Sequence, residues 1–299
     1  MKRKNDMKLI HTTMLLLLIT VPGLALEVEG FTPDKTVVYK KVGPSELKIH
    51  IFTPANHTLA DKRPAIVFFF GGGWNGGSPS QFYSHCDYLA SRGMVAMSAE
   101  YRVKTRHGTS PRECVKDGKT AIRWIRLHSD ELGIDPGKLA AGGGSAGGHV
   151  AAATATVRGF NKEGEDQNIS CKPNALVLFN PVFDNSPGGY GYDRVKEYWK
   201  DFSPMHNISE NTPPTIVFLG TKDKLIPTAT AEQYRKLMAD KDRRCDLYLY
   251  KDQEHGFFNH RNKKYFTATV IEADRFLASL GYLKGKPTLQ NKPDPGDNE

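Results

Sequence analysis

Four short runs of the chain are apolar at nearly every position, and they restrict the possible folds more than any other feature. The runs are residues 64–70, 94–99, 175–179 and 215–219. A strand with one wet face alternates apolar and polar residues, whereas a continuous apolar run is typical of a strand covered on both faces. We therefore expect an α/β fold, a three-layer α/β/α sandwich around a mostly parallel sheet. With a hairpin of two strands at 36–53, a strand at 246–250 and the strand that precedes Ser145, the sheet has eight strands.

Further elements are expected around these runs. They are a hairpin at 36–42 and 47–53, a helix from 110 to about 131, a strand at 246–250 and a helix at 265–280. The helix at 110 begins with a capping box of Ser110 and Glu113, with proline at its first helical position. Together these elements predict one large domain at residues 26–283.

Composition and charge exclude several classes of protein. With 299 residues, 39% hydrophobic and 25% charged, the chain is typical of a soluble globular protein. The formal charge is +8, but much of it lies in the first eight residues. The other lysines and arginines are scattered, without a basic helix or an aromatic–basic motif. We therefore expect neither nucleic acid nor a stable membrane anchor as a partner, and the sequence leaves the oligomeric state open.

The two ends of the chain differ from the body. Basic residues precede an apolar run at 14–19, and Gly23 and Ala25 supply the small residues that a signal peptidase needs. We expect residues 1–25 to be a signal peptide cleaved after Ala25, and the protein to be secreted or periplasmic. An uncleaved or lipidated N-terminus is the alternative. Residues 284–299 are rich in proline, glycine and charge, which predicts a disordered tail.

Export makes the four cysteines relevant. They are widely spaced and match no zinc-ligand pattern: Cys86, Cys114, Cys171 and Cys245. Cys86 and Cys114 lie on helices that flank one strand, which makes a disulfide between them possible in an oxidising compartment. Four free thiols are an equal alternative, because buried cysteine is common.

A serine flanked by glycines, Gly143-Gly144-Ser145-Ala146-Gly147, lies between an apolar strand and an alanine-rich helix. A strand that turns directly into a helix strains the residue between them. Side chains two positions away would clash, so glycine is needed at 143 and 147. The pattern predicts an exposed hydroxyl at the helix N-terminus, where the helix dipole favours negative charge.

Three further motifs accompany this serine. They are Phe70-Gly71-Gly72-Gly73-Trp74 upstream, then Gly220-Thr221-Lys222-Asp223 and Glu254-His255-Gly256-Phe257 downstream. Between about residues 36 and 282 the chain resembles the α/β-hydrolase superfamily. More closely it resembles the esterase branch related to hormone-sensitive-lipase-like and bacterial carbohydrate esterases. The order serine, aspartate, histidine is the order of that superfamily's triad.

The resemblance implies roles for particular residues. Ser145 is the expected nucleophile, His255 the base that takes its proton, and Asp223 the acid that orients the imidazole. Asp252 and Glu254 are rivals of Asp223. No metal or cofactor is expected.

The expected oxyanion donors are the backbone N–H groups of Gly72, Gly73 and Ala146. The family pattern usually has histidine where this chain has Phe70, and that histidine orders the loop rather than reacting.

Residues 182–212 form a long aromatic connection without a clean period, which predicts a small cap over the site. A surface loop packed onto the body is the alternative. The expected substrate contacts are Trp74, Tyr101, Phe183 and Tyr190, although Trp74 fits a core position equally well.

These expectations converge on a serine esterase. We predict hydrolysis of short acyl esters, with a small-molecule or oligosaccharide ester as substrate, for example an acetylated or feruloylated carbohydrate. One alternative is a peptidase of the prolyl-oligopeptidase kind, for which too little chain precedes residue 36 to build the usual propeller. The other is a hydrolase fold used only for binding, in which a triad residue is typically lost.

Overall fold

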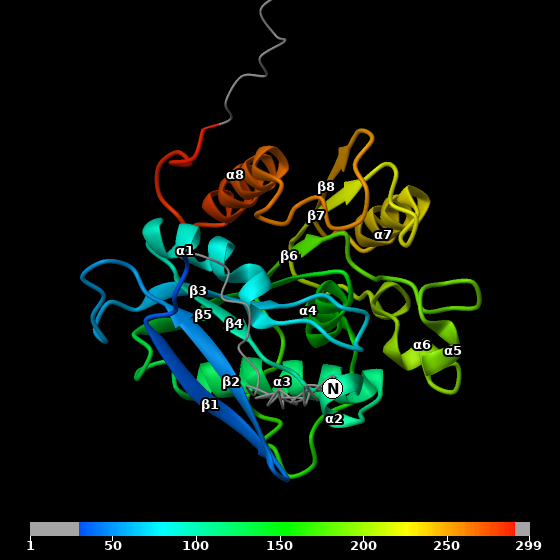
Figure 1. Ribbon diagram of the computed structural model, residues 1–299, viewed down its shortest axis with the longest axis horizontal. Helices are drawn as coiled ribbons and strands as arrows, with labels where there is room; N and C mark the ends of the chain where they lie inside the picture. The colour runs from blue at the N-terminus through cyan, green and yellow to red at the C-terminus, as the bar shows by residue number, and fades with distance from the viewer. Residues whose placement is uncertain (1–29, 291–299) are drawn as a thin grey trace, which may run out of the picture.

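An eight-stranded sheet runs through the computed structural model, which describes residues 30–290 (Figure 1). The strand order is β1-β2-β4-β3-β5-β6-β7-β8. Only the pairs β1–β2 and β2–β4 are antiparallel, so the expected mostly parallel sheet is confirmed. The strands are β1 (Lys35–Val42), β2 (Ser45–Phe52), β3 (Arg63–Phe69), β4 (Val95–Ala99), β5 (Ile134–Gly144), β6 (Ala175–Phe179), β7 (Thr215–Gly220) and β8 (Cys245–Tyr250).

Helices follow most strands, as the pattern predicted. They are α1 (Tyr83–Ser91), α2 (Lys104–His107), α3 (Pro111–Leu127), α4 (Ala146–Thr156), α5 (Tyr192–Val195), α6 (Trp199–Phe202), α7 (Thr228–Ala239) and α8 (Lys263–Ser279), with 3-10 turns η1 (Pro79–Phe82) and η2 (Pro204–Asn207). Helix α3 opens at the capping box of Ser110 and Glu113, and ends at Leu127, earlier than predicted.

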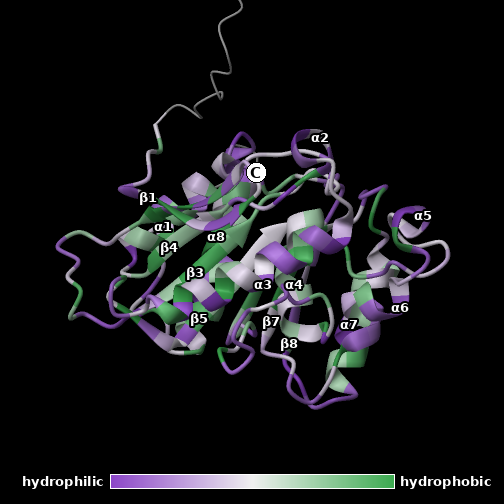
Figure 2. Ribbon diagram, turned by 90° about the horizontal axis from the view of Figure 1, so that it is seen from below, coloured by the Kyte–Doolittle hydropathy of each residue, from purple (hydrophilic) through white to green (hydrophobic). Residues whose placement is uncertain are grey.

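Alternate residues of the central strands enter two separate cores. In β3, Ala65, Val67 and Phe69 pack on one face with side chains of α3, α4 and α7. Ile66 and Phe68 pack on the other face with α1 and α8. Figure 2 shows the apolar strands between these helices. Because both faces are covered, the strands carry no polar face, and each buried Ile or Phe contributes about 1.5–3 kcal/mol.

The two cores decide the state of the cysteines. Cys86 of α1 lies in one core and Cys114 of α3 in the other, so the sheet separates the two thiols. The disulfide considered between them is therefore absent, and within residues 30–290 all four cysteines are free. Burial raises the pKa of both Cys86 and Cys114, which keeps these thiols protonated and unreactive.

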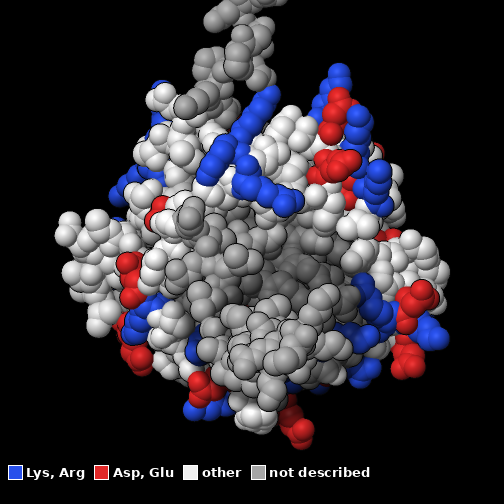
Figure 3. Space-filling view, in the orientation of Figure 1, with Lys and Arg blue, Asp and Glu red and all other residues white. Residues whose placement is uncertain are grey.

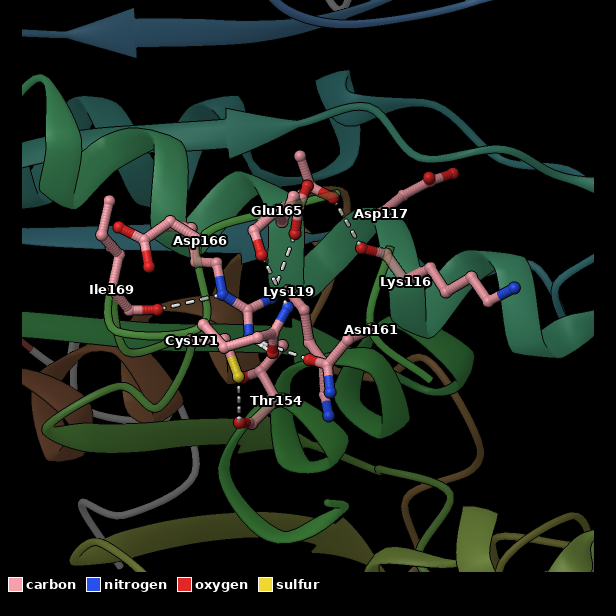
Figure 4. A network of polar contacts seen from close by, with 12 residues as sticks. Lys116, Asp117, Lys119, Thr154, Asn161, Glu165, Asp166, Ile169 and Cys171 are labelled. Atoms are coloured by element: carbon pink, nitrogen blue, oxygen red, sulfur yellow. Dashed lines mark hydrogen bonds and ion pairs between the residues drawn. The ribbon is translucent and has the colours of Figure 1, made fainter. Parts of the chain in front are cut away.

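A buried lysine holds the end of α4. Lys119 Nζ donates hydrogen bonds to three backbone carbonyls there, those of Val157, Arg158 and Gly159, at 2.6, 3.4 and 2.5 Å. Its neighbour Arg123 donates hydrogen bonds to the connection that follows α4, at Ile169, Glu165, Asn161 and Gln167. Figure 4 labels Asn161, Glu165 and Ile169 of this connection together with Lys119. Burial lowers the pKa of Lys119 to about 8. The positive end group also suits a helix C-terminus, so α4, which begins beside Ser145, is fixed at its far end.

The ends of the chain are only partly described. Residues 1–25, the expected signal peptide, lie outside the described range, as does the last part of the expected tail. Residues 284–290 are described and pack on the domain, where Arg92 Nη2 donates to the carbonyl of Lys284 at 3.0 Å. Within residues 30–290 no helix is long and apolar enough to cross a membrane, and no three metal-binding side chains are grouped to hold a metal ion. Figure 3 shows Lys and Arg mixed with Asp and Glu around the visible rim.

Candidate active site

Ser145 lies at a strained turn between β5 and α4. Its backbone has φ 53° and ψ −121°, a conformation that L-residues rarely adopt. A Cβ atom at Gly147 would overlap the carbonyl oxygens of Phe69 and Phe70, and one at Gly143 would overlap Gly147. The prediction that glycine is needed two residues before and after the serine is therefore confirmed.

His255 and Asp223 meet beyond the carboxyl ends of β8 and β7. His255 Nδ1 lies 2.7 Å from Asp223 Oδ2, and the Asp223 side chain is fully buried. The other carboxylate oxygen, Oδ1, accepts the backbone N–H groups of Leu225 and Ile226 at 2.8 and 2.9 Å. Asp252, a rival for this role, instead pairs with Lys222 at the surface. Asp223 is thus the carboxylate that the fold brings to the imidazole.

Asn180, directly after β6, is a site residue that sequence reasoning missed. Its fully buried side chain accepts the N–H of Gly256 at Oδ1, 2.8 Å away. This bond fixes the amide orientation, so Nδ2 faces His255 Nε2 at 3.4 Å as a donor. Nε2 is then the unprotonated nitrogen, and the ring proton lies on Nδ1 toward Asp223. The signal available in the sequence was the position of Asn180 directly after a buried strand. In the structure its φ is 34°, a conformation that asparagine adopts more readily than most residues.

The elbow is joined to the segment that carries Asn180. Ser145 N–H donates to the carbonyl of Phe179 at 3.0 Å, and Val182 N–H donates to the carbonyl of Ser145 at 3.2 Å. Among the described residues the Ser145 hydroxyl makes no hydrogen bond to His255, whose Nε2 faces Asn180. The structure therefore joins His255 to Asp223 but not to Ser145, a contact that in hydrolases often tightens only when substrate is bound.

Residues 71–77, the expected oxyanion loop, pass beside Ser145. A Cβ at Gly71 would lie 3.4 Å from the Cβ of Ser145. Gly72, Gly73 and Trp74 have φ of 126°, 62° and 60°, so this backbone turns sharply. Within residues 30–290, the backbone N–H groups of Gly72, Gly73 and Ala146 donate to no protein acceptor. The three predicted oxyanion donors are thus free to bind a ligand.

Three of the four expected substrate contacts are packing residues instead. Trp74 is 1% exposed, and Tyr101 and Phe183 are 0% exposed, so none of them can touch a substrate in this structure. Tyr101 stacks on Phe70 at 4.2 Å and donates to its carbonyl at 2.5 Å. Phe183 stacks on Tyr234 at 3.8 Å. The prediction for these side chains is wrong because all three aromatic rings are buried against other side chains of the protein.

Tyr190, the fourth, is partly exposed and lies where the cap meets the oxyanion loop. Residues 182–212, the expected cap, contain α5, α6 and η2. Arg194 of α5 donates from Nη1 to the carbonyl of Gly73 at 2.6 Å. Its guanidinium lies 4.9 Å from the ring centre of Trp74 and 5.4 Å from that of Tyr190. The cap therefore holds the oxyanion loop through one cation and two aromatic rings.

Comparisons with known proteins agree with this geometry. Residues 49–187 match the BD-FAE family model, and residues 183–280 match that of the dienelactone hydrolase family. The structure of Thermogutta terrifontis esterase 2 is 45% identical in sequence, with a TM-score of 0.81, over 84% of this chain and 96% of that one. A strained serine after a parallel strand and a histidine–aspartate pair define an α/β hydrolase. The chain belongs to the α/β-hydrolase superfamily, in its esterase branch.

Curated relatives are more distant. Esterase LipC of Mycobacterium tuberculosis is 30% identical over 191 residues, which cover 57% of this chain and 47% of LipC. An acetylxylan esterase of Xylanibacter ruminicola is 27% identical over 230 residues, 72% of this chain and 45% of that protein. The chain thus matches about half the length of these relatives.

Proposed function

We propose that this chain is a serine carboxylic-ester hydrolase with Ser145 as nucleophile, His255 as base and Asp223 as the acid that orients the imidazole. The observation that carries the proposal is the 2.7 Å bond between His255 and Asp223, at the sheet edge where Ser145 is held at a strained turn. Sites in open α/β sheets form at this edge. The esterase names of the relatives support the same chemistry.

The residues perform the reaction in two halves. His255 Nε2 takes the proton of Ser145 Oγ while Oγ attacks the ester carbonyl. The developing oxyanion accepts hydrogen bonds from the backbone N–H groups of Gly72, Gly73 and Ala146. The imidazolium then gives its proton to the leaving alcohol, which leaves an acyl group on Ser145. Water, deprotonated by Nε2, attacks this acyl-enzyme and releases the acid. Loss of one such amide donor costs about 3–4 kcal/mol in other hydrolases.

We propose short acyl groups, with a small-molecule or oligosaccharide alcohol. Solved structures of the Thermogutta esterase are described as propionate bound and butyrate bound, and one relative is named for acetylxylan. In this chain Trp74, His149 and Phe202 fill the space between the oxyanion loop and the cap. Tight packing there favours a small acyl group over a long one.

Rates on a series of esters test the substrate class. We expect higher kcat/KM on p-nitrophenyl acetate or butyrate than on the octanoate, and release of acetate or ferulate from decorated xylan. The variant Ser145→Ala should hydrolyse none of these esters. Equal or better activity on octanoate, with no acid released from xylan, would reject the carbohydrate assignment while leaving ester hydrolysis in place.

Export is a separate proposal, supported by the sequence pattern of residues 1–25. N-terminal sequencing of the protein recovered outside the cytoplasm should give Leu26 as its first residue. Recovery of the chain only in the cytoplasm with Met1 intact would reject it.

A further inference from the structure

Two side chains connect the oxyanion loop to the histidine loop, residues 251–262. The N–H of Gly71 donates to Gln81 Oε1 at 2.7 Å, and Gln81 Nε2 donates to Asn259 Oδ1 at 2.9 Å. Asn259 Nδ2 then donates to the carbonyl of Gly256 at 2.7 Å. Gln81 lies in η1 and Asn259 far along the chain, so this bridge joins parts of the site that are 178 residues apart in sequence. We call the Gln81–Asn259 pair the strut.

The orientation of both amides is determined from the two ends of the strut. A backbone N–H can only donate, so Gln81 must present its oxygen to Gly71 and its nitrogen to Asn259. A backbone carbonyl can only accept, so Asn259 must present its nitrogen to Gly256. Both requirements are met at the bond between the two side chains, in which Gln81 Nε2 donates and Asn259 Oδ1 accepts. Each amide is therefore held in one orientation, and replacing either amide removes two hydrogen bonds.

The strut ends one residue beyond the histidine, at the carbonyl of Gly256. Gly256 follows His255 directly, and its N–H is bound by Asn180, which also faces His255 Nε2. At the other end, Gly71 precedes the free amides of Gly72 and Gly73 and lies beside Ser145. Hydrogen bonds that run in one donor direction strengthen one another. The strut thus spans the distance between the imidazole and the oxyanion donors.

We propose that Gln81 and Asn259 are positioning residues, which set His255 and the amides of Gly72 and Gly73 at a fixed separation for the transition state. The inference rests on the proposed ester hydrolysis. The imidazole and the oxyanion amides act on the reacting atoms only as charge develops in the transition state. A change in the strut should therefore affect kcat more than KM. A bridge that merely stabilises the fold would change neither constant in the folded enzyme.

A double-mutant cycle tests the proposal. The variants are Gln81→Met, Asn259→Leu and the double variant, each nearly matched in volume, with Ser80→Ala in the same turn as control. We expect each single variant to lower kcat on p-nitrophenyl acetate about tenfold, because the two lost hydrogen bonds act on the reacting groups only through the backbone, with KM within about twofold. The double variant should lose no more than either single one, because the strut acts as one unit.

If the apolar variants fail to fold, Gln81→Glu replaces them in the test, because glutamate has the shape of glutamine. Its carboxylate still accepts the Gly71 N–H but turns a second acceptor toward Asn259, so the same loss of kcat is expected at neutral pH. Unchanged kcat in all strut variants, or losses that multiply in the double variant, would overturn the proposal. The proposed function is tested separately: the wild type should hydrolyse the ester, and Ser145→Ala should not.

Hydrogen exchange tests the coupling without turnover. Asn259→Leu should accelerate amide exchange in the peptide containing residues 71–77, although Asn259 does not touch this loop. Ser80→Ala should leave that peptide unchanged. Normal protection of residues 71–77 in Asn259→Leu would overturn the inference whether or not the enzyme hydrolyses esters.

Discussion

The histidine side and the cap side of the site are held by different forces. On the histidine side, Asp223, His255 and Asn180 form hydrogen bonds in which each donor and acceptor is determined. On the cap side, the described contacts between residues 182–212 and the oxyanion loop are one hydrogen bond from Arg194 to Gly73 and stacking around Trp74. Hydrogen bonds fix atoms and protonation states, whereas packing fixes volumes. The histidine side should therefore tolerate substitution far less than the cap side.

Asp223→Asn should give the largest effect on the histidine side. The new amide keeps an oxygen for the N–H groups of Leu225 and Ile226, and its NH2 then faces His255 Nδ1. This selects the wrong tautomer, which lowers kcat roughly 10⁴-fold in a serine–histidine–aspartate triad on an unrelated fold. The measurement is kcat on p-nitrophenyl acetate, with Asp252→Asn as the matched surface control. A loss below tenfold, or an equal loss in the control, would move the acid role away from Asp223.

Asn180→Asp separates the two contacts of that side chain. One oxygen still accepts the Gly256 N–H, while the other places an acceptor against the unprotonated Nε2 of His255. We expect about a tenfold loss of kcat, the order of one hydrogen bond. Steady-state kinetics at neutral pH give the value. Wild-type kcat in a folded variant would show that the Asn180 contact plays no part in the reaction.

Arg194→Met tests the cap side. It removes the bond to Gly73 and the cation above Trp74, but leaves the aromatic packing in place. We expect kcat/KM to fall about tenfold at most, because the lost hydrogen bond to Gly73 and the partly exposed cation–π contact, itself only about 0.5–1 kcal/mol, act on the loop and not directly on the reacting atoms. Arg112→Met is the matched control, since Arg112 lies 4.3 Å from the ring centre of Tyr198 in the cap without contacting the loop. A loss above a hundredfold for Arg194→Met would make the cap side as sensitive as the histidine side.

His85→Phe should give the smallest effect, on stability alone. His85 is buried among five aromatic rings, and both ring nitrogens lack a partner in the described residues. Burial lowers its pKa to about 3 from an ordinary value of 6.5. Between these two pKa values, His85 binds a proton in the unfolded chain but stays neutral in the folded protein. The free energy of unfolding therefore decreases as the pH falls from 6.5 toward 3.

The phenylalanine variant lacks the part of this pH dependence of stability that His85 contributes. We expect the drop in Tm between pH 7.5 and pH 5 to be smaller for His85→Phe than for the wild type, as measured by thermal unfolding. His149, whose pKa burial also lowers to about 3, leaves part of the drop in place. An unchanged drop would show that His85 is not the proton-linked group.

The sequence predicts the backbone of this site better than its side chains. The apolar runs predicted the strands because a strand covered on both faces has no polar position to interrupt it. The glycines at 143 and 147 predicted the elbow because only they fit there. Trp74, Tyr101 and Phe183 were misassigned because an aromatic residue near a site gives the same sequence pattern whether its side chain faces the substrate or the core. Asn180 and the strut were missed because single amides in loops carry no periodic signal.

The central claim is that Ser145 is a nucleophile activated by the His255–Asp223 pair. Reaction with a fluorophosphonate, followed by intact mass measurement, tests it most directly. The wild type should gain one adduct on Ser145, Ser145→Ala should gain none, and His255→Gln should react far more slowly. A wild type that stays unmodified, or an adduct that persists in Ser145→Ala, would contradict the account.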